Sequence, residues 1–141
     1  MRILVLTLLA FTVSARAQIV SDAVVSAMPW KKHAHTAYMV IENNTEKKIK
    51  LLSAKTNTAN EIRFDFRPLG SKTYTRIVKS FEIGPKEKIE FVPNGSKVLL
   101  NGFKSKSFKA GDKINIELFF DTGKTVIIQP EIKIIRKKDM K

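Results

Sequence analysis

Apolar and polar residues alternate along most of this sequence, and that pattern restricts the fold to β-strands. The clearest example is KINIELFF, residues 113–120, where every even-numbered position is apolar and positions 113, 115 and 117 are polar. Successive side chains of a strand point to opposite faces, so this segment would bury one face and expose the other. No run of ten or more residues shows a convincing helical stripe.

Turn-forming residues such as Asn, Gly and Pro separate the alternating segments at short intervals. We expect eight strands, at 36–42, 49–54, 61–67, 74–80, 88–92, 97–101, 113–120 and 125–135. Pro130 has no backbone N–H, so the last strand should bend, bulge or lie at an edge there. Short strands at this spacing predict an all-β fold, an antiparallel sandwich or barrel.

Residues 1–17 read as a signal peptide and not as part of the fold. Arg2 precedes an apolar run at 3–13 that is shorter than the ~20 residues needed to span a bilayer. The small residues of Ala15-Arg16-Ala17 predict cleavage before Gln18. A buried N-terminal helix is the alternative, although the chain turns polar directly afterwards. The mature protein would be periplasmic, with one domain at 18–135 and a basic flexible tail at 136–141.

The chain is strongly basic, with 26 Lys and Arg, 13 Asp and Glu, and a net charge of +13. Removal of residues 1–17 leaves 24 basic and 13 acidic residues. Nucleic acid is not expected as a partner, because an exported protein meets little of it and no aromatic–basic stripe suited to base stacking is present. Most lysines would protect strand edges from pairing. A patch that attracts anionic lipid or an acidic protein is the alternative.

The absence of cysteine excludes disulfides, thiolate metal sites and cysteine nucleophiles. No nucleophile elbow, phosphate-binding loop or H-E-x-x-H motif occurs, and both histidines lie on one short segment. Asp65 and Asp121 are not distinguished from ordinary carboxylates at strand ends. We therefore expect a protein that is not an enzyme.

Five segments in order resemble the periplasmic copper chaperone family PCu(A)C, which delivers copper to the Cu(A) centre of cytochrome oxidase. They are AYMVIEN at 37–43, LLSA at 51–54, FEIGP at 81–85, PNGSKVLLNGF at 93–103 and FKAGDK at 108–113. The resemblance covers about residues 27–135. It implies a β-sandwich that is cupredoxin-like.

The same resemblance implies where a copper site would lie. That family binds Cu(I) through a His, a Met eleven positions later, a His twenty-two positions further and a Met two beyond, ligands soft enough to need no cysteine. Anchored on the turn at 92–95, these positions hold Phe64, Thr75, Lys97 and Leu99, none of which is a ligand. A shift of one residue offers Arg63, Tyr74, Ser96 and Val98, which is no better. The copper site is therefore expected to be degenerate, with an ammonium at Lys97 that repels a cation.

His33 and His35 offer a replacement metal site just ahead of the first expected strand. In an extended segment the two rings would share a face with Met39, and together these three could hold copper or zinc. Lys31 and Lys32 beside them disfavour a cation, so two exposed histidines without metal are the alternative. Met28 also lies close to these histidines in sequence and adds only slightly to the case for a metal site.

Three functions stay open. The first is a copper-chaperone-like binding module with a degenerate site, which meets an acceptor or envelope protein. The second is an active metallochaperone that uses His33, His35 and Met39, with copper as cofactor. The third is a basic envelope protein held on an anionic membrane surface. We expect a monomer, but the sequence does not settle the oligomeric state.

Overall fold

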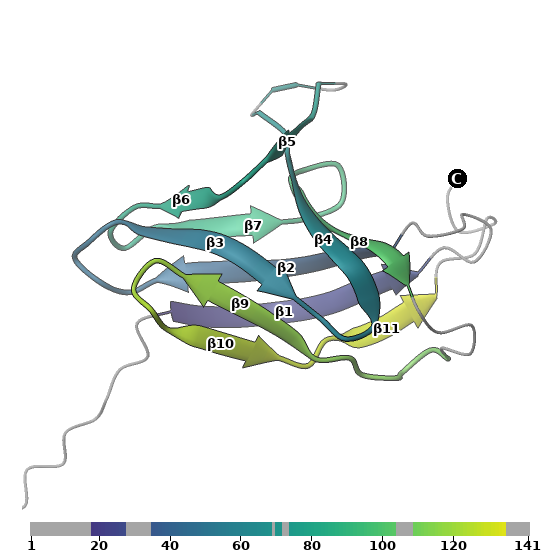
Figure 1. The fold of residues 1–141 in the computed structure, drawn as a ribbon. Helices are drawn as coiled ribbons and strands as arrows, with labels where there is room; N and C mark the ends of the chain where they lie inside the picture. Colours follow the sequence, from purple (N-terminus) through teal and green to yellow (C-terminus); the bar gives the residue numbers. More distant parts are fainter. Residues whose placement is uncertain (1–17, 28–34, 69, 72–73, 104–108, 135–141) are drawn as a thin grey trace, which may run out of the picture.

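The computed structural model describes residues 18–27, 35–68, 70–71, 74–103 and 109–134, and this part of the chain consists of strands and turns (Figure 1). Its eleven strands are β1 (Gln18–Ala27), β2 (His35–Asn43), β3 (Ile49–Lys55), β4 (Ala59–Phe66), β5 (Arg76–Val78), β6 (Phe81–Ile83), β7 (Lys88–Phe91), β8 (Lys97–Phe103), β9 (Ile116–Phe120), β10 (Thr125–Ile128) and β11 (Glu131–Ile134). No helix within the described ranges is long and apolar enough to cross a membrane.

Two sheets pack face to face. The large sheet has the order β11-β1-β2-β8-β4-β5, and the small sheet has the order β10-β9-β3-β6. β7 also belongs to the large sheet: it pairs with residues 39–42 of β2, whereas β8 pairs with residues 35–37 of the same strand. Figure 1 shows the small sheet in front of the large one. The strand ladders are antiparallel except that between β1 and β11, which is parallel. The expected all-β sandwich is confirmed.

The structure adds one strand that the sequence does not predict and changes several of the expected ones. β1 was not expected, because a register shift between Ser21 and Val24, with Asp22 at a φ of 54°, breaks its alternation. The segment 74–80 forms only the three residues of β5, and the chain then enters the small sheet as β6. The segment 125–135 is divided near Pro130 into β10 and β11, which belong to different sheets.

The strand expected at 113–120 begins later, at Ile116, and Lys113 forms an isolated bridge with Glu131 instead. Its even-numbered apolar side chains are nevertheless all buried, as the alternation indicated. The expected signal peptide at 1–17 and the tail at 136–141 lie outside the described residues.

Apolar side chains from the facing sides of the two sheets form one core. Its largest fully buried members are Phe91, Met39, Ile41, Ile49, Leu51, Ile83, Leu100, Ile116, Leu118, Ile132, Val25 and Val98. Phe81 of β6 links the two sheets, because its ring lies 5.5 Å from that of Phe64 and 5.0 Å from that of Phe91, both edge to face. This aromatic contact holds β4 and β7 of the large sheet against β6 of the small sheet.

Candidate functional site

The ladder between β4 and β8 determines which of the expected ligand positions can meet. Arg63 pairs with Leu99, Phe64 with Val98, and Asp65 with Lys97. Residues that face each other in an antiparallel ladder point to the same side of the sheet, and their neighbours along the strand point to the other side. Arg63, Asp65, Lys97 and Leu99 therefore share the outer face of the large sheet; we call them the outer cluster.

Phe64 does not belong to the outer cluster. Its side chain is only 4% exposed and lies in the core against Phe81, on the same side as the fully buried Val98. Thr75 is exposed and precedes β5, where Arg76 pairs with Phe66. The structure thus brings Lys97 and Leu99 together, places Arg63 beside them, and directs Phe64 to the opposite face.

The positions shifted by one residue are split in the same way. Arg63 lies on the outer face, whereas Val98 is buried in the core, and Ser96 and Tyr74 precede β8 and β5. Counting residues from the turn at 92–95 therefore gives positions on both faces of the large sheet, with Phe64 in the core and Lys97 and Leu99 on the outer face. A displacement of one residue exchanges the two faces of a strand, so residue counting alone does not determine the face.

The outer cluster offers little to a soft metal ion. The Arg63 guanidinium and the Lys97 ammonium have no lone pair under neutral conditions, and Leu99 has no donor atom. Arg63 Nε lies 3.1 Å from the Glu61 carboxylate. The only ligand atoms in the cluster are the hard oxygens of Asp65, which suit Ca²⁺ or Mg²⁺ better than Cu(I).

Arg67 fixes the turn from which Lys97 emerges. Its Nη1 donates to the Asn94 carbonyl at 2.6 Å, and its backbone N–H donates to Ser96 Oγ at 3.1 Å. Asn94 itself has a φ of 66°, the left-handed conformation that Asn tolerates well. β4 and the turn before β8 are therefore tied together, which holds Lys97 opposite Asp65.

Sequence reasoning missed Ile77 of β5, which extends the outer cluster. Ile77 pairs with Asp65 and is 56% exposed, while its neighbour Arg76 lies over the Phe66 ring at 5.3 Å. The signal was present in the alternation of 74–80, but the strand is too short for its faces to be assigned from the sequence.

Of the three expected metal ligands, the structure describes only His35 and Met39. His33 and Met28 lie outside the described residues. His35 begins β2 on the core side, the side that Met39 also faces, but Met39 is 1% exposed and pairs with Phe91. At ~3.3 Å per residue the two lie about 13 Å apart along the strand, too far to bind one ion. No group of three or more potential His, Cys, Asp or Glu ligands occurs within the described ranges.

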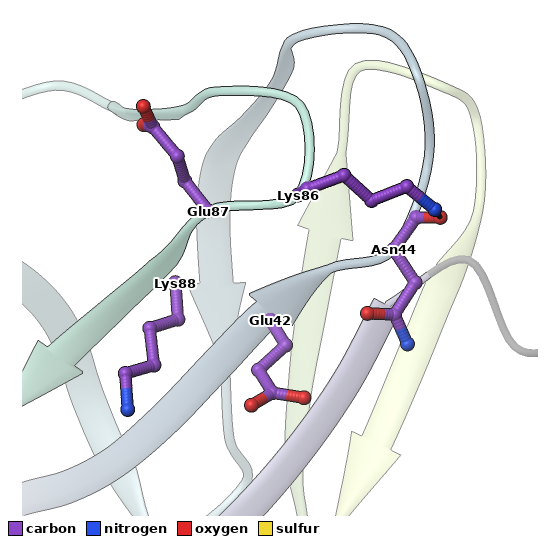
Figure 2. Close-up of a pocket in the computed structure, with 5 residues that line it drawn as sticks. All are labelled: Glu42, Asn44, Lys86, Glu87 and Lys88. Atoms are coloured by element: carbon purple, nitrogen blue, oxygen red, sulfur yellow. Dashed lines mark hydrogen bonds between the residues drawn. The ribbon is translucent and has the colours of Figure 1, made fainter.

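A shallow pocket of about 460 Å³ lies where β2 ends and β7 begins, and Glu42, Asn44, Lys86, Glu87 and Lys88 line it (Figure 2). Lys86 Nζ donates to the Asn44 carbonyl at 2.8 Å and lies 3.4 Å from Glu46, and Lys88 lies 3.2 Å from Glu90. Figure 2 shows the Lys86 side chain reaching across to Asn44 while Glu87 extends away. Its cations already have partners, so we assign this pocket no ligand.

Comparison with known proteins agrees with this architecture. Residues 19–132 match a family model described as "Putative lipoprotein LpqE-like". The copper-bound PCuAC domain from PmoF2 superposes with a TM-score of 0.73 at 17% identity, over 84% of this chain and 94% of that one. DR1885 from Deinococcus radiodurans, in its Cu(I) form, gives a TM-score of 0.72 at 24% identity, over 88% and 83% of the two chains.

The apo form of DR1885 gives a TM-score of 0.65 at 26% identity, over 86% of this chain and 82% of that one. A search of curated proteins gave no match. The expected resemblance to PCu(A)C proteins and the cupredoxin-like sandwich are confirmed by these matches. Because the family model spans most of the sandwich, from β1 into β11, the chain belongs to the LpqE-like family.

Proposed function

We propose that this protein is an exported, non-enzymatic binding module with the PCuAC fold that holds no Cu(I) at the position its fold relatives would use. The observation that carries the proposal is the outer cluster. On the face where β4 and β8 meet, Arg63 and Lys97 supply two cations, Leu99 supplies no donor, and Asp65 supplies only oxygen. Cu(I) prefers soft ligands such as thiolate, thioether or imidazole, and two adjacent cations raise the cost of bringing any metal ion there.

Export is supported by the apolar run at 3–13 after Arg2 and by the small residues before Gln18. The family description, which names lipoproteins, is consistent with a protein of the cell envelope. A function without catalysis is supported by the outer cluster as well, since it contains neither a histidine nor a nucleophile.

In place of copper, the outer cluster would bind a protein partner. Arg63 and Lys97 can donate to carboxylates, and the exposed side chain of Ile77 supplies apolar area next to them. Arg67 holds the turn before Lys97, so these groups are fixed in place before a partner arrives. An acidic, partly apolar surface on an acceptor or envelope protein fits this chemistry.

A Cu(I) titration against a competing chelator tests the proposal. DR1885, whose Cu(I) form has been solved, serves as the positive control. At protein concentrations where the control takes Cu(I) from the chelator, we expect this protein to leave Cu(I) bound to the chelator. A tight one-to-one complex that survives replacement of His33 and His35 by Ala would contradict the degenerate site. A complex that those replacements abolish would favour the histidine metallochaperone instead.

A further inference from the structure

Gln18, the first residue of β1, is a polar side chain in a buried place. It pairs with Asn43 of β2, and residues that face each other in an antiparallel ladder point to the same side of the sheet. Gln18 is only 5% exposed, and its amide nitrogen Nε2 is buried without a hydrogen-bond partner in the part of the chain that the structure describes. Most buried polar groups in folded proteins have a partner, so this nitrogen is unusual.

The residue opposite does not supply the missing partner. Asn43 Oδ1 accepts a hydrogen bond from the backbone N–H of Thr45 at 3.0 Å and another from the Thr45 hydroxyl at 2.6 Å, which occupies both of its lone pairs. The amide nitrogen of Asn43 is a donor, as is Gln18 Nε2, so these two do not bond to each other. The Gln18 amide nitrogen therefore contributes no hydrogen bond to the folded state.

The proposed export adds a second unfavourable group to the same residue. Cleavage before Gln18 turns its backbone nitrogen into an α-ammonium. A charge at a buried position is costly unless a group of opposite charge pairs with it. The neighbouring carboxylate on β2 is that of Glu42, which lies opposite Ile19 and also opposite Lys88 of β7, so a cation is already beside it.

We propose that Gln18, once it is the N-terminal residue, cyclises to pyroglutamate; this modification rests on the proposed export. The neutral α-amine attacks the side-chain carbonyl carbon Cδ. The bond between the α-nitrogen and Cδ forms, and the bond between Cδ and Nε2 breaks. Nε2 leaves as ammonia with one proton from the amine, and a five-membered lactam remains. No oxidant, reductant or second substrate takes part.

The lactam suits this position better than the open form. It keeps the N–H and the C=O of residue 18, so hydrogen bonds of the ladder with Asn43 can be retained. The nitrogen that leaves is the atom that has no partner, and the terminal positive charge disappears with it. The folded protein therefore favours the cyclised form, in which β1 begins without a free amino group that an aminopeptidase could attack.

Mass spectrometry of the exported protein tests the modification. The full 141-residue chain is expressed in a bacterium, and the protein recovered from the envelope is digested so that its N-terminal peptide can be sequenced. We expect a peptide that begins at residue 18 and is lighter than its sequence by one ammonia. It should resist Edman degradation until pyroglutamyl aminopeptidase has removed its first residue.

Two controls accompany this measurement. In the variant Gln18→Asn the side chain is one methylene too short for the five-membered ring, so the peptide should keep its full mass and a free amino group. A synthetic peptide of residues 18–27 is carried through the same work-up and should keep its ammonia. If it cyclises to the same extent as the protein, the folded chain plays no part and the proposal is overturned.

Export and cyclisation fail in different ways. A peptide that begins at residue 18 with an intact glutamine would overturn the cyclisation and leave the proposed export standing. A peptide that begins at another residue would contradict the cleavage before Gln18, and an uncleaved chain would contradict the export itself; either result also overturns the modification. Copper titration is independent of these results.

Discussion

The amide of Asn43, at the end of β2, donates to the backbone carbonyl of Ile83 at 3.0 Å, across a separation of 40 residues in the chain. The same nitrogen lies 3.0 Å from the Gly84 carbonyl and 2.8 Å from that of Lys47, and Asn43 Oδ1 accepts from Thr45. One fully buried side chain thus joins the turn after β2 to the turn after β6. Asn43 ends the segment AYMVIEN, so this residue of the family resemblance stabilises the fold.

Replacing Asn43 by Ala should lower the free energy of unfolding by about 3 kcal/mol, because buried carbonyls would lose their donor. The exposed neighbour Asn44, replaced by Ala, is the matched control and should cost less than about 0.5 kcal/mol. Urea unfolding followed by circular dichroism measures both. Equal costs for the two variants would show that the Asn43 hydrogen bonds do not stabilise the fold.

Gly102 in β8 should tolerate a methyl group less well than Gly123. Both have positive φ, 67° and 81°, which costs an Ala about 1 kcal/mol at either position. A Cβ at Gly102 would also lie 3.0 Å from Asn60 Cβ, while nothing lies within 4 Å at Gly123. Thermal unfolding of G102A and G123A should show roughly twice the destabilisation in the former. If G123A is equally destabilised, the contact with Asn60 contributes nothing.

Tyr38 should make stability fall at high pH. Burial raises the pKa of its phenol above the ordinary value, and a hydrogen bond with Thr36 opposes that rise. The neutral phenol is thus favoured in the folded state, so its contribution is complete below the pKa of the unfolded chain, near 10, and is lost as pH rises through the higher folded pKa. Ultraviolet titration of the wild type and of Tyr38→Phe isolates this group. Removing the Thr36 hydroxyl in Thr36→Val should raise the Tyr38 pKa further, and a fall would contradict this assignment.

Alternation was sufficient to predict the sandwich, because burial on one face imposes period two wherever a strand is regular. It failed at β1, where the bulge near Asp22 changes the phase of the pattern. It also failed at 74–80, where the three residues of β5 are too few for a period to be recognised.

The candidate site was predicted less completely. The strand that carries Lys97 and Leu99 could be predicted, because the turn at 92–95 fixes where β8 begins. Phe64 could not be distinguished from Arg63, because residue counting assumes that the loops between strands keep their length. Which of two neighbouring residues shares a face with Leu99 depends on the register of β4 against β8, and that register is a property of the tertiary structure.

That register predicts how a Cu(I) site could be introduced on the outer face. Arg63 and Leu99 face each other, and Lys97 is the next outward residue on β8, so imidazoles at 63 and 97 and a thioether at 99 would share the outer face. These ligands suit Cu(I), and their substitution also removes two cations from the cluster. A site with these three ligands should therefore take Cu(I) from a chelator from which the wild type takes none.

We expect the triple variant Arg63→His, Lys97→His, Leu99→Met to gain at least 100-fold in Cu(I) affinity, or about 2.7 kcal/mol. The matched control carries Phe64→His in place of Arg63→His. It offers the same ligand types, but its first imidazole would point into the core against Phe81, so it should gain much less and should lose stability. Chelator competition measures affinity, and X-ray absorption counts the nitrogen and sulfur ligands. If the Phe64→His variant binds copper as tightly as the Arg63→His variant, the outer face is not where this fold would hold the metal.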